Sequence, residues 1–118
     1  MIQADPFHDL KIQVKTYELT NITLPELAEK CGVSLATFKR HFKKVYGTSA
    51  HKYMKAKRLE KSKELILNSS RNISDIYKDV GFEEFAHFSK SFKAHFGVNP
   101  SRIRSLFDYA FSLFWRQN

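Results

Sequence analysis

Apolar residues recur at helical spacing along the chain, and residues 85–100 show this most clearly. Four aromatic residues in this segment follow one another at steps of three and four, which aligns them on one face of a helix. They are Phe85, Phe88, Phe92 and Phe96. We expect this stripe to be buried core. The other face carries Ser89, Lys90 and Lys93, with no carboxylate from 85 to 107. That face is either an ordinary solvated surface or a positive surface that meets a polyanion.

The same pattern occurs twice in the chain, because residues 24–33 resemble residues 73–82. Beyond a shared glycine the alignment continues, with one extra residue in the second copy. The aligned aromatic residues are Phe38 with Phe88, Phe42 with Phe92, and Tyr46 with Phe96. Two copies of one supersecondary unit are fewer than the three or more repeats of a solenoid.

Capping residues divide each copy into two helices around a turn that contains glycine. Thr23 followed by Glu26 predicts a capping box, and Asn72 with Asp75 offers a similar cap in the second copy. Ser34 is suited to cap the second helix of the first copy. Each copy therefore predicts a helix, a tight turn and a second helix.

The segments outside the repeats also predict helices. Residues 50–68 contain no glycine or proline and predict one continuous connecting helix, and residues 7–19 predict a leading helix. The predicted fold is all-α, with two helix-turn-helix subdomains and about seven helices. The expected parts are a leading segment over 1–20, the first subdomain over 21–49, the connecting helix over 50–68, the second subdomain over 69–105, and an apolar C-terminal helix over 106–118.

Charge is unevenly distributed along the sequence. Lys and Arg number 20 against 12 Asp and Glu, which gives a net charge of +8. Residues 34–58 hold eight of the basic residues and no acidic residue, so the positive charge is concentrated in the first subdomain and the start of the connecting helix. Such segregation favours a directed positive surface, as expected of a nucleic-acid-binding domain. Charges on the connecting helix itself, Arg58 included, are expected to be mainly solvating.

Several classes of function find no support in the sequence. The single cysteine, Cys31, excludes an internal disulfide framework, and the five histidines show no metal-ligand spacing, so we expect neither metal nor cofactor. No phosphate-binding loop, nucleophile elbow or paired carboxylates occur, which argues against an enzyme. The sequence has no signal-peptide pattern and no apolar run of about 18 residues. We therefore expect a cytoplasmic protein that does not interact with membranes.

Two helices joined by a tight turn indicate a helix-turn-helix, whose second helix enters the DNA major groove. The candidate groove helices are 35–46 and 84–96. In the first, the buried stripe leaves an outward set of Ala36, Thr37, Lys39, Arg40, Lys43 and Lys44. Arg and Lys can bind guanine, and small apolar groups can contact a thymine methyl. A connecting helix of this length predicts a monomer that reads two half-sites about one turn apart.

Two strings of this sequence, "ITLPELAEKCGVSLATFKRHFKKVYG" and "GFEEFAHFSKSFKAHFGVNPSRIR", resemble the DNA-binding domain of the AraC/XylS family of bacterial transcription regulators. The resemblance covers roughly residues 20–105, and the second string is highly specific for the family. It implies two helix-turn-helix subdomains joined by a rigid helix. It also implies binding to double-stranded DNA near promoters and, usually, activation of transcription through RNA polymerase.

The resemblance carries over to individual positions. The positions that match base-reading residues are Ala36, Lys39, Arg40, Phe85, Ala86, Ser89 and Lys90. The expected contacts to DNA phosphate are Ser34, Thr37, Lys43, Lys44, Lys93 and Arg102.

The sequence departs from the family pattern at two positions. Tyr77 stands where the family usually has a small alanine, as at Ala28 in the first copy, so the helix packing of the second subdomain is expected to be adjusted. Phe85 stands where a polar base-reading residue is common. The second helix is then expected to read methyl groups or shape, or to contribute mainly phosphate contacts.

Family members often carry an N-terminal sensing domain, and dimer contacts usually lie outside the DNA-binding domain. These 118 residues leave no room for a sensing domain, so the chain is either a stand-alone regulator or a fragment of a longer protein. A missing sensing domain or a dimer partner is therefore among the expected partners.

Two other functional classes and one segment stay open at this point. A basic helical module can bind RNA or single strands, although such proteins need exposed aromatic residues. The phenylalanines here are spaced for burial, with Phe85 as the one exception to consider. A protein-interaction domain that retains the fold is the other alternative. The apolar tail over 106–118 is expected to pack on the second subdomain, or else to form a docking surface.

Overall fold

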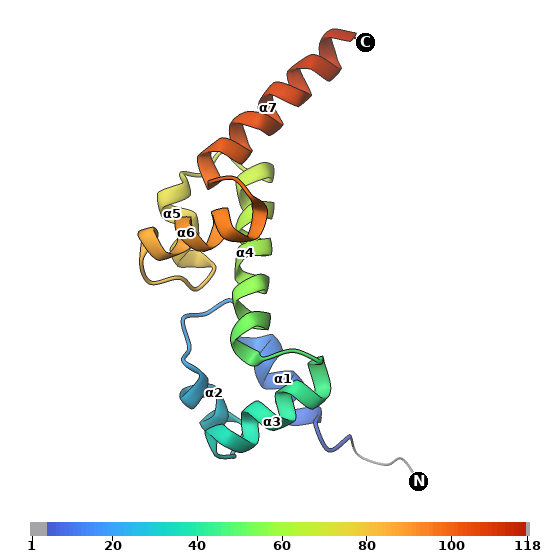
Figure 1. Ribbon diagram of the computed structural model, residues 1–118, viewed down its shortest axis with the longest axis vertical. Helices are drawn as coiled ribbons and strands as arrows, with labels where there is room; N and C mark the ends of the chain where they lie inside the picture. The colour runs from blue at the N-terminus through green and yellow to red at the C-terminus, as the bar shows by residue number, and fades with distance from the viewer. Residues whose placement is uncertain (1–4, 118) are drawn as a thin grey trace. The chain divides into compact units, whose positions relative to one another are not determined.

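The computed structural model describes residues 5–117, and these residues form seven helices and no strand. The all-α prediction is confirmed (Figure 1). Expectations that concern residues 1–4 and 118 lie outside the described part. The helices are α1 (His8–Tyr17), α2 (Leu24–Lys30), α3 (Leu35–Tyr46), α4 (Ala50–Asn68), α5 (Ile73–Asp79), α6 (Phe85–Phe96) and α7 (Pro100–Gln117).

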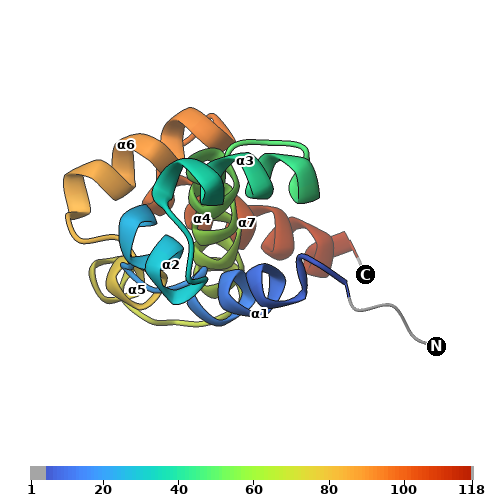
Figure 2. The ribbon, with the colours of Figure 1, turned by 90° about the horizontal axis from the view of Figure 1, so that it is seen from below.

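The chain forms two compact units, residues 1–58 and residues 59–118, and the division between them falls within α4. In the first unit, α1, α2 and α3 gather around the first half of α4 (Figures 1 and 2). Their shared core is apolar and almost fully buried, as expected from the helical periodicity. It comprises Leu10, Val14, Leu27, Ala28, Phe38, Phe42, Ala50 and Met54.

Two caps fix the helices of the first unit. The amide of Glu26 donates to Thr23 Oγ1 at 3.3 Å, and the amide of Thr23 donates back to Glu26 Oε2 at 3.2 Å. The predicted capping box is therefore confirmed. Ser34 Oγ accepts from the Thr37 amide at 3.2 Å, so the predicted cap of α3 is confirmed as well. Gly47 then ends α3 with φ +74°, a conformation that side-chain-bearing residues rarely adopt.

The second unit is built on the same plan around the second half of α4 (Figure 1). Its core comprises Leu59, Ile66, Ile76, Val80, Phe82, Phe88 and Phe92. One member of the predicted stripe departs from the expectation, because Phe85 is 44% exposed. Phe85 is the first residue of α6, and its ring meets Tyr77 edge-on and lies tilted against Phe88, with centroids 5.5 Å and 6.2 Å away. The prediction that Phe85 is buried core is therefore wrong.

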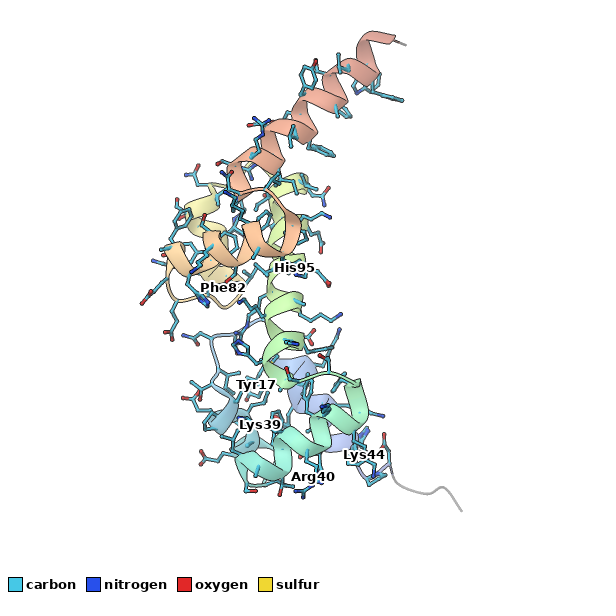
Figure 3. All side chains as sticks on the ribbon, viewed as in Figure 1. Tyr17, Lys39, Arg40, Lys44, Phe82 and His95 are labelled. Carbon is cyan, nitrogen blue, oxygen red and sulfur yellow. The ribbon has the colours of Figure 1, made fainter. Side chains whose placement is uncertain are left out.

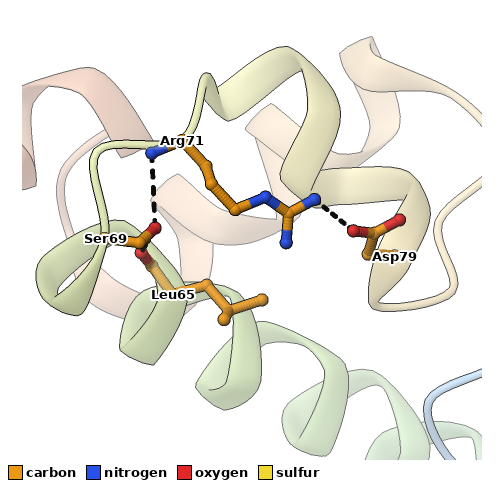
Figure 4. A network of polar contacts seen from close by, with 4 residues as sticks. All are labelled: Leu65, Ser69, Arg71 and Asp79. Carbon is orange, nitrogen blue, oxygen red and sulfur yellow. Dashed lines mark hydrogen bonds and ion pairs between the residues drawn. The ribbon is translucent and has the colours of Figure 1, made fainter.

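The link between α4 and α5 is held by side chains other than those predicted. Ser69 Oγ donates to the Leu65 carbonyl at 2.6 Å and accepts from the Arg71 amide at 3.4 Å (Figure 4). Arg71 also forms an ion pair with Asp79 at the end of α5. The Asn72 side chain makes no capping hydrogen bond, so the predicted cap there is wrong.

The last helix, α7, runs without a break from Pro100 through the predicted boundary at residue 106. Its first turns pack on the second unit through Ile103, while its second half extends away from α5 and α6 (Figure 1). Residues 106–115 are all exposed, so the expectation that the tail packs on the second subdomain is wrong. Within the described part of the chain, no helix combines the length and apolar character that crossing a membrane requires.

Candidate nucleic-acid interface

The strongest candidate surface is the outer side of α3. Phe38 and Phe42 on its inner side are completely buried in the first unit. That burial turns the opposite side outward, and Figure 3 shows Lys39, Arg40 and Lys44 along it. The exposed residues of this surface are Ala36, Lys39, Arg40, Lys43 and Lys44. Since residues 34–58 contain no acidic side chain, these cations have no carboxylate neighbour on their own helix.

Hydroxyl groups organise the start of this surface. Ser34 Oγ donates to Thr37 Oγ1 at 3.0 Å, in addition to accepting from the Thr37 amide. The guanidinium of Arg40 donates to the same Thr37 oxygen at 3.5 Å. Ser34 is exposed and Thr37 is half-buried. Thr37 therefore acts mainly as a hydrogen-bond partner of Ser34 and Arg40. This chain of contacts holds Arg40 above the first turn of α3.

The far end of α3 contacts the segment that leads into α1. The Lys44 ammonium lies 5.9 Å from the Phe7 ring centroid, and the Phe7 ring meets His41 edge-on at 5.2 Å. A cation over an aromatic ring is attracted by the ring's negative face. Phe7 was missed by the sequence reasoning, because its contact with α3 joins segments distant in sequence. Lys44 is therefore held toward Phe7, whereas Lys39 and Arg40 project from the middle of the helix.

The corresponding surface of α6 has a different chemistry. Phe85 and Ala86 are exposed at its start, Ser89 is half-buried, and Lys90 and Lys93 are exposed. The α6 surface therefore offers an apolar tip followed by two cations.

Tyr77 accounts for the way Phe85 is held. Its ring stacks on the buried Phe88 at 6.1 Å and meets Phe85 edge-on at 5.5 Å. The first unit has the small Ala28 at this position, so only the second unit supports an aromatic residue at the head of its groove helix.

Arg102 lies in the first turn of α7, within the second unit, and its side chain is exposed. Its backbone amide donates to Asn99 Oδ1 at 2.8 Å, so Asn99 caps this helix. The sequence reasoning missed Asn99, although an asparagine directly before a proline is a recognisable helix start. The residues predicted to contact DNA therefore form two groups. One group lies on α3, and the other lies on α6 and the start of α7.

Two arginines that the sequence reasoning did not single out as structural tie segments together. Arg58 Nε donates to the Glu18 carbonyl at 3.2 Å, and its Nη2 donates to the Thr20 carbonyl. Burial lowers the pKa of Arg58 from its ordinary value. The expectation that Arg58 mainly solvates the connecting helix is therefore wrong, because its forked donors satisfy backbone carbonyls at the end of α1.

Arg104 does the same in the second unit. Its Nε donates to the Ile66 carbonyl at 3.0 Å and its Nη2 to the Ser69 carbonyl at 3.2 Å. These carbonyls lie at the C-terminal end of α4, which leaves backbone acceptors without helical donors. The one sequence signal for the structural role of Arg58 is that it is an arginine in a helix otherwise rich in lysine. No sequence signal marks the structural role of Arg104.

The remaining candidate for chemistry is the lone thiol. Burial raises the pKa of Cys31 from its ordinary value, and the nearby charge of Asp9 raises it further. Since the thiolate is the reactive form, this environment makes Cys31 a packing residue in the first unit. Among the described residues, no three His, Cys, Asp or Glu side chains gather as metal ligands would.

Comparisons with known proteins agree with this geometry. A family model described as a helix-turn-helix domain matches residues 27–105. The HTH-type transcriptional regulator ExsA of Pseudomonas aeruginosa is 33% identical over 95 residues, which cover 80% of this chain and 34% of that protein. The virulence regulon transcriptional activator VirF of Yersinia enterocolitica is 35% identical over 81 residues, covering 69% of this chain and 30% of that protein.

A solved structure shares the fold. The DNA-binding domain of AdpA, a global transcriptional factor determined in complex with a target DNA, aligns with a TM-score of 0.81. The alignment covers 91% of this chain and 96% of that chain at 18% identity. The present chain spans about one third of the length of the curated relatives it matches.

Proposed function

Because the chain belongs to the AraC family of helix-turn-helix transcription regulators, we propose that it binds double-stranded DNA sequence-specifically and regulates transcription. The observation that carries the proposal is the outer side of α3. It projects exposed Lys39 and Arg40 from a helix anchored by fully buried Phe38 and Phe42. A rigid, basic helix with its side chains turned outward is the element that enters a major groove.

In this proposal α3 reads bases near its middle and holds phosphate at its ends. Arg40 has a planar fork of donors that matches O6 and N7 of guanine, and Lys39 can bind the same acceptors. Ala36 is small enough to contact a thymine methyl. The phosphate contacts are assigned to Ser34, Thr37, Lys43 and Lys44, which position the helix without carrying sequence information.

The α6 surface is proposed to read a second half-site in the next major-groove face. Phe85 and Ala86 contribute apolar contacts that suit thymine methyl groups, while Ser89 and Lys90 supply hydrogen bonds. Lys93 and Arg102 are assigned to phosphate. This second reading is expected to be less specific, since its leading residue is an aromatic ring without a hydrogen-bonding group.

We extend the proposal to activation through contact with RNA polymerase, since one relative is named a transcriptional activator. Most of the length of the relatives lies outside the match, which leaves room there for a sensing domain or for dimer contacts. We propose that this chain likewise works with a sensing domain or a dimer partner. We also propose that it acts in the cytoplasm, where bacterial DNA is transcribed.

The test is selection of binding sites from a randomised duplex library at about 150 mM salt, followed by titration of the selected duplex and of its separate strands. Two enriched motifs with centres roughly 10 bp apart are expected. A single motif would restrict sequence reading to one helix. Absence of any enriched motif would contradict the proposed function.

A pair of variants assigns the surface. Lys39→Ala with Arg40→Ala is expected to weaken binding to the selected duplex about 100-fold, since each good base contact contributes about 1–3 kcal/mol. The matched control is Lys11→Ala with Lys15→Ala on α1, which removes the same charge from exposed positions. The control separates a specific contact from general electrostatic attraction. Equal losses in both variants would remove the assignment to α3.

One observation favours a second candidate function, the binding of single strands. Aromatic rings on which bases can stack are exposed at Phe85 and along the second half of α7. However, residues 106–115 carry no basic side chain that could follow a phosphate backbone. Duplex binding is therefore the better-supported function, and the single-strand titration above distinguishes the two.

A further inference from the structure

The second half of α7 exposes an apolar surface for which DNA binding has no use. We define this α7 apolar surface by its large exposed side chains, which are between 39% and 65% accessible. They are Leu106, Phe107, Tyr109, Phe111, Leu113, Phe114 and Trp115. Monomeric proteins rarely expose contiguous apolar patches of more than a few hundred Å². A surface of this size on one helix therefore calls for an occupant.

The spacing of residues along α7 is that of a helix that pairs with another helix. Its apolar positions include a seam at steps of three and four, formed by Phe107, Ala110 and Phe114, which continues the line of Ile103 in the core of the second unit. Similar steps recur on the other side for Ser101, Ser105, Asp108 and Ser112. An apolar seam with a polar back is the pattern by which one amphipathic helix packs on another. Ala110 in the middle of the seam lets two helix backbones approach closely.

The aromatic rings of this surface are already ordered against one another. Phe107 and Phe111 are nearly parallel, with centroids 6.4 Å apart, and Phe111 meets Trp115 at 5.8 Å. These contacts follow the helix axis and leave the outward faces of the rings accessible. Association then has fewer side-chain rotamers to immobilise, which reduces its entropic cost.

The area available reaches the lower limit for a specific dimer. A fully covered aromatic side chain buries about 150–250 Å², so the roughly half-exposed side chains that flank the seam offer about 500 Å² per copy and about 1,000 Å² for a pair. They are Leu106, Phe107, Phe111, Leu113 and Phe114. A specific interface buries at least about 1,000 Å² in total. We propose that α7 is a self-association helix, through which two copies of this chain pair their α7 apolar surfaces.

The charges of α7 favour a second copy over a membrane surface. Asp108 is the only charged residue among residues 106–115, and it lies on the polar back, so two copies meet without like-charge repulsion. Helices that lie on membranes carry Lys and Arg along the polar face, whereas the polar back of the exposed stretch carries Ser105, Asp108 and Ser112. This inference does not depend on DNA binding, because it uses none of the residues assigned to that function.

The chain contains its own reporter for the test. Trp115 is the sole tryptophan, is 61% exposed and contacts Phe111, so its fluorescence reports on the edge of the α7 apolar surface. We expect sedimentation of the full chain at about 100 µM to give twice the monomer mass. Dilution should shift the Trp115 emission to longer wavelength as water returns to the indole. A monomeric mass with emission independent of concentration would overturn the proposal.

Two matched double variants assign the interface. Phe107→Glu with Phe114→Glu introduces charge into the seam, and we expect at least a 100-fold weaker dimer. Ser105→Glu with Ser112→Glu adds the same charge at the same spacing on the polar back, and should leave dimerisation unchanged within about threefold. All four positions are exposed, so both variants should fold, as circular dichroism will verify. Equal effects of the two variants, or a monomeric wild type that binds anionic phosphatidylserine vesicles, would overturn the assignment to a second copy.

Discussion

The two helix-turn-helix units share a core and differ at the surface. Phe38 and Phe42 in the first unit and Phe88 and Phe92 in the second are all completely buried. Each unit also uses one arginine, Arg58 or Arg104, to satisfy backbone carbonyls. The repeated sequence thus preserves the residues that hold each unit together.

The differences concern the helix ends and the groove helices. The first unit has side-chain caps on both α2 and α3, whereas α5 and α6 have no side-chain capping bond. The middle of α3 is basic, while α6 begins with an exposed aromatic ring. A repeat can therefore keep its packing and change the chemistry of its exposed surface, because buried and exposed positions alternate along the same helix.

The largest expected effect tests the shared core. Phe38→Ala and Phe88→Ala each remove a completely buried ring, and each should lower the free energy of unfolding by about 3–5 kcal/mol. Urea unfolding followed by circular dichroism measures the loss. Phe85→Ala is the control, and should cost about 1 kcal/mol because that side chain is 44% exposed. A loss for Phe85→Ala as large as that for Phe88→Ala would mean that Phe85 belongs to the core after all.

The next effect separates the two groove helices. Arg40→Ala should cost about 1–3 kcal/mol of binding to the selected duplex and relax specificity at one base pair. Lys90→Ala should change base preference less than Arg40→Ala does, because the α6 surface is proposed to read its half-site less specifically. Titrations of single-base-pair variants of the site measure both. A change in base preference with Lys90→Ala as large as that with Arg40→Ala would show that α6 reads sequence as sharply as α3.

A smaller effect tests the equivalence of the two arginines. Arg58→Ala and Arg104→Ala each leave two backbone carbonyls without their donors, which should cost about 1–2 kcal/mol of folding stability. Arg58→Lys keeps the charge but loses the fork, so it should recover only part of the loss. Thermal unfolding of these variants beside Arg102→Ala, an exposed arginine, provides the comparison. Full recovery by lysine would show that charge, and not the fork, is what matters.

The sequence predicted what depends on local pattern. The connecting helix has the predicted bounds of 50–68, and the capping box at Thr23 forms as expected. Helical period also identified the buried phenylalanines, with the exception of Phe85. Phe85 is the exception because the helical period shows which face of α6 is buried, but not how far along α6 the neighbouring residues cover that face.

The rest depends on contacts between distant segments. Arg104 binds carbonyls 35 and 38 residues earlier in the chain, and no local pattern records such a contact. The same holds for Phe7, which contacts His41 and Lys44. In the candidate site, the basic side of α3 was predictable from the buried stripe and the charge distribution. The support that Tyr77 gives to Phe85 required the structure.

The smallest expected effect tests the difference in capping. Thr23→Ala removes an acceptor that holds the Glu26 amide, and should lower the free energy of unfolding by about 1 kcal/mol. Asn72→Ala removes a side chain that makes no capping bond, and should change stability by less than about 0.5 kcal/mol. Urea unfolding of both single variants measures this contrast. Thr23→Ser, which keeps the hydroxyl, should retain most of the stability.

The contrast matters because the two positions carry similar sequence signals. If both alanine variants lose about 1 kcal/mol, Asn72 caps α5 in solution and the two units are equivalent at their first helices. If only Thr23→Ala loses stability, the segment before α5 is held by the ion pair between Arg71 and Asp79 and not by a side-chain cap. That pair is exposed and should weaken in salt, whereas the capping box should not. Repeating the measurement at about 1 M salt, where charges are screened over about 3 Å, would then destabilise the second unit more than the first.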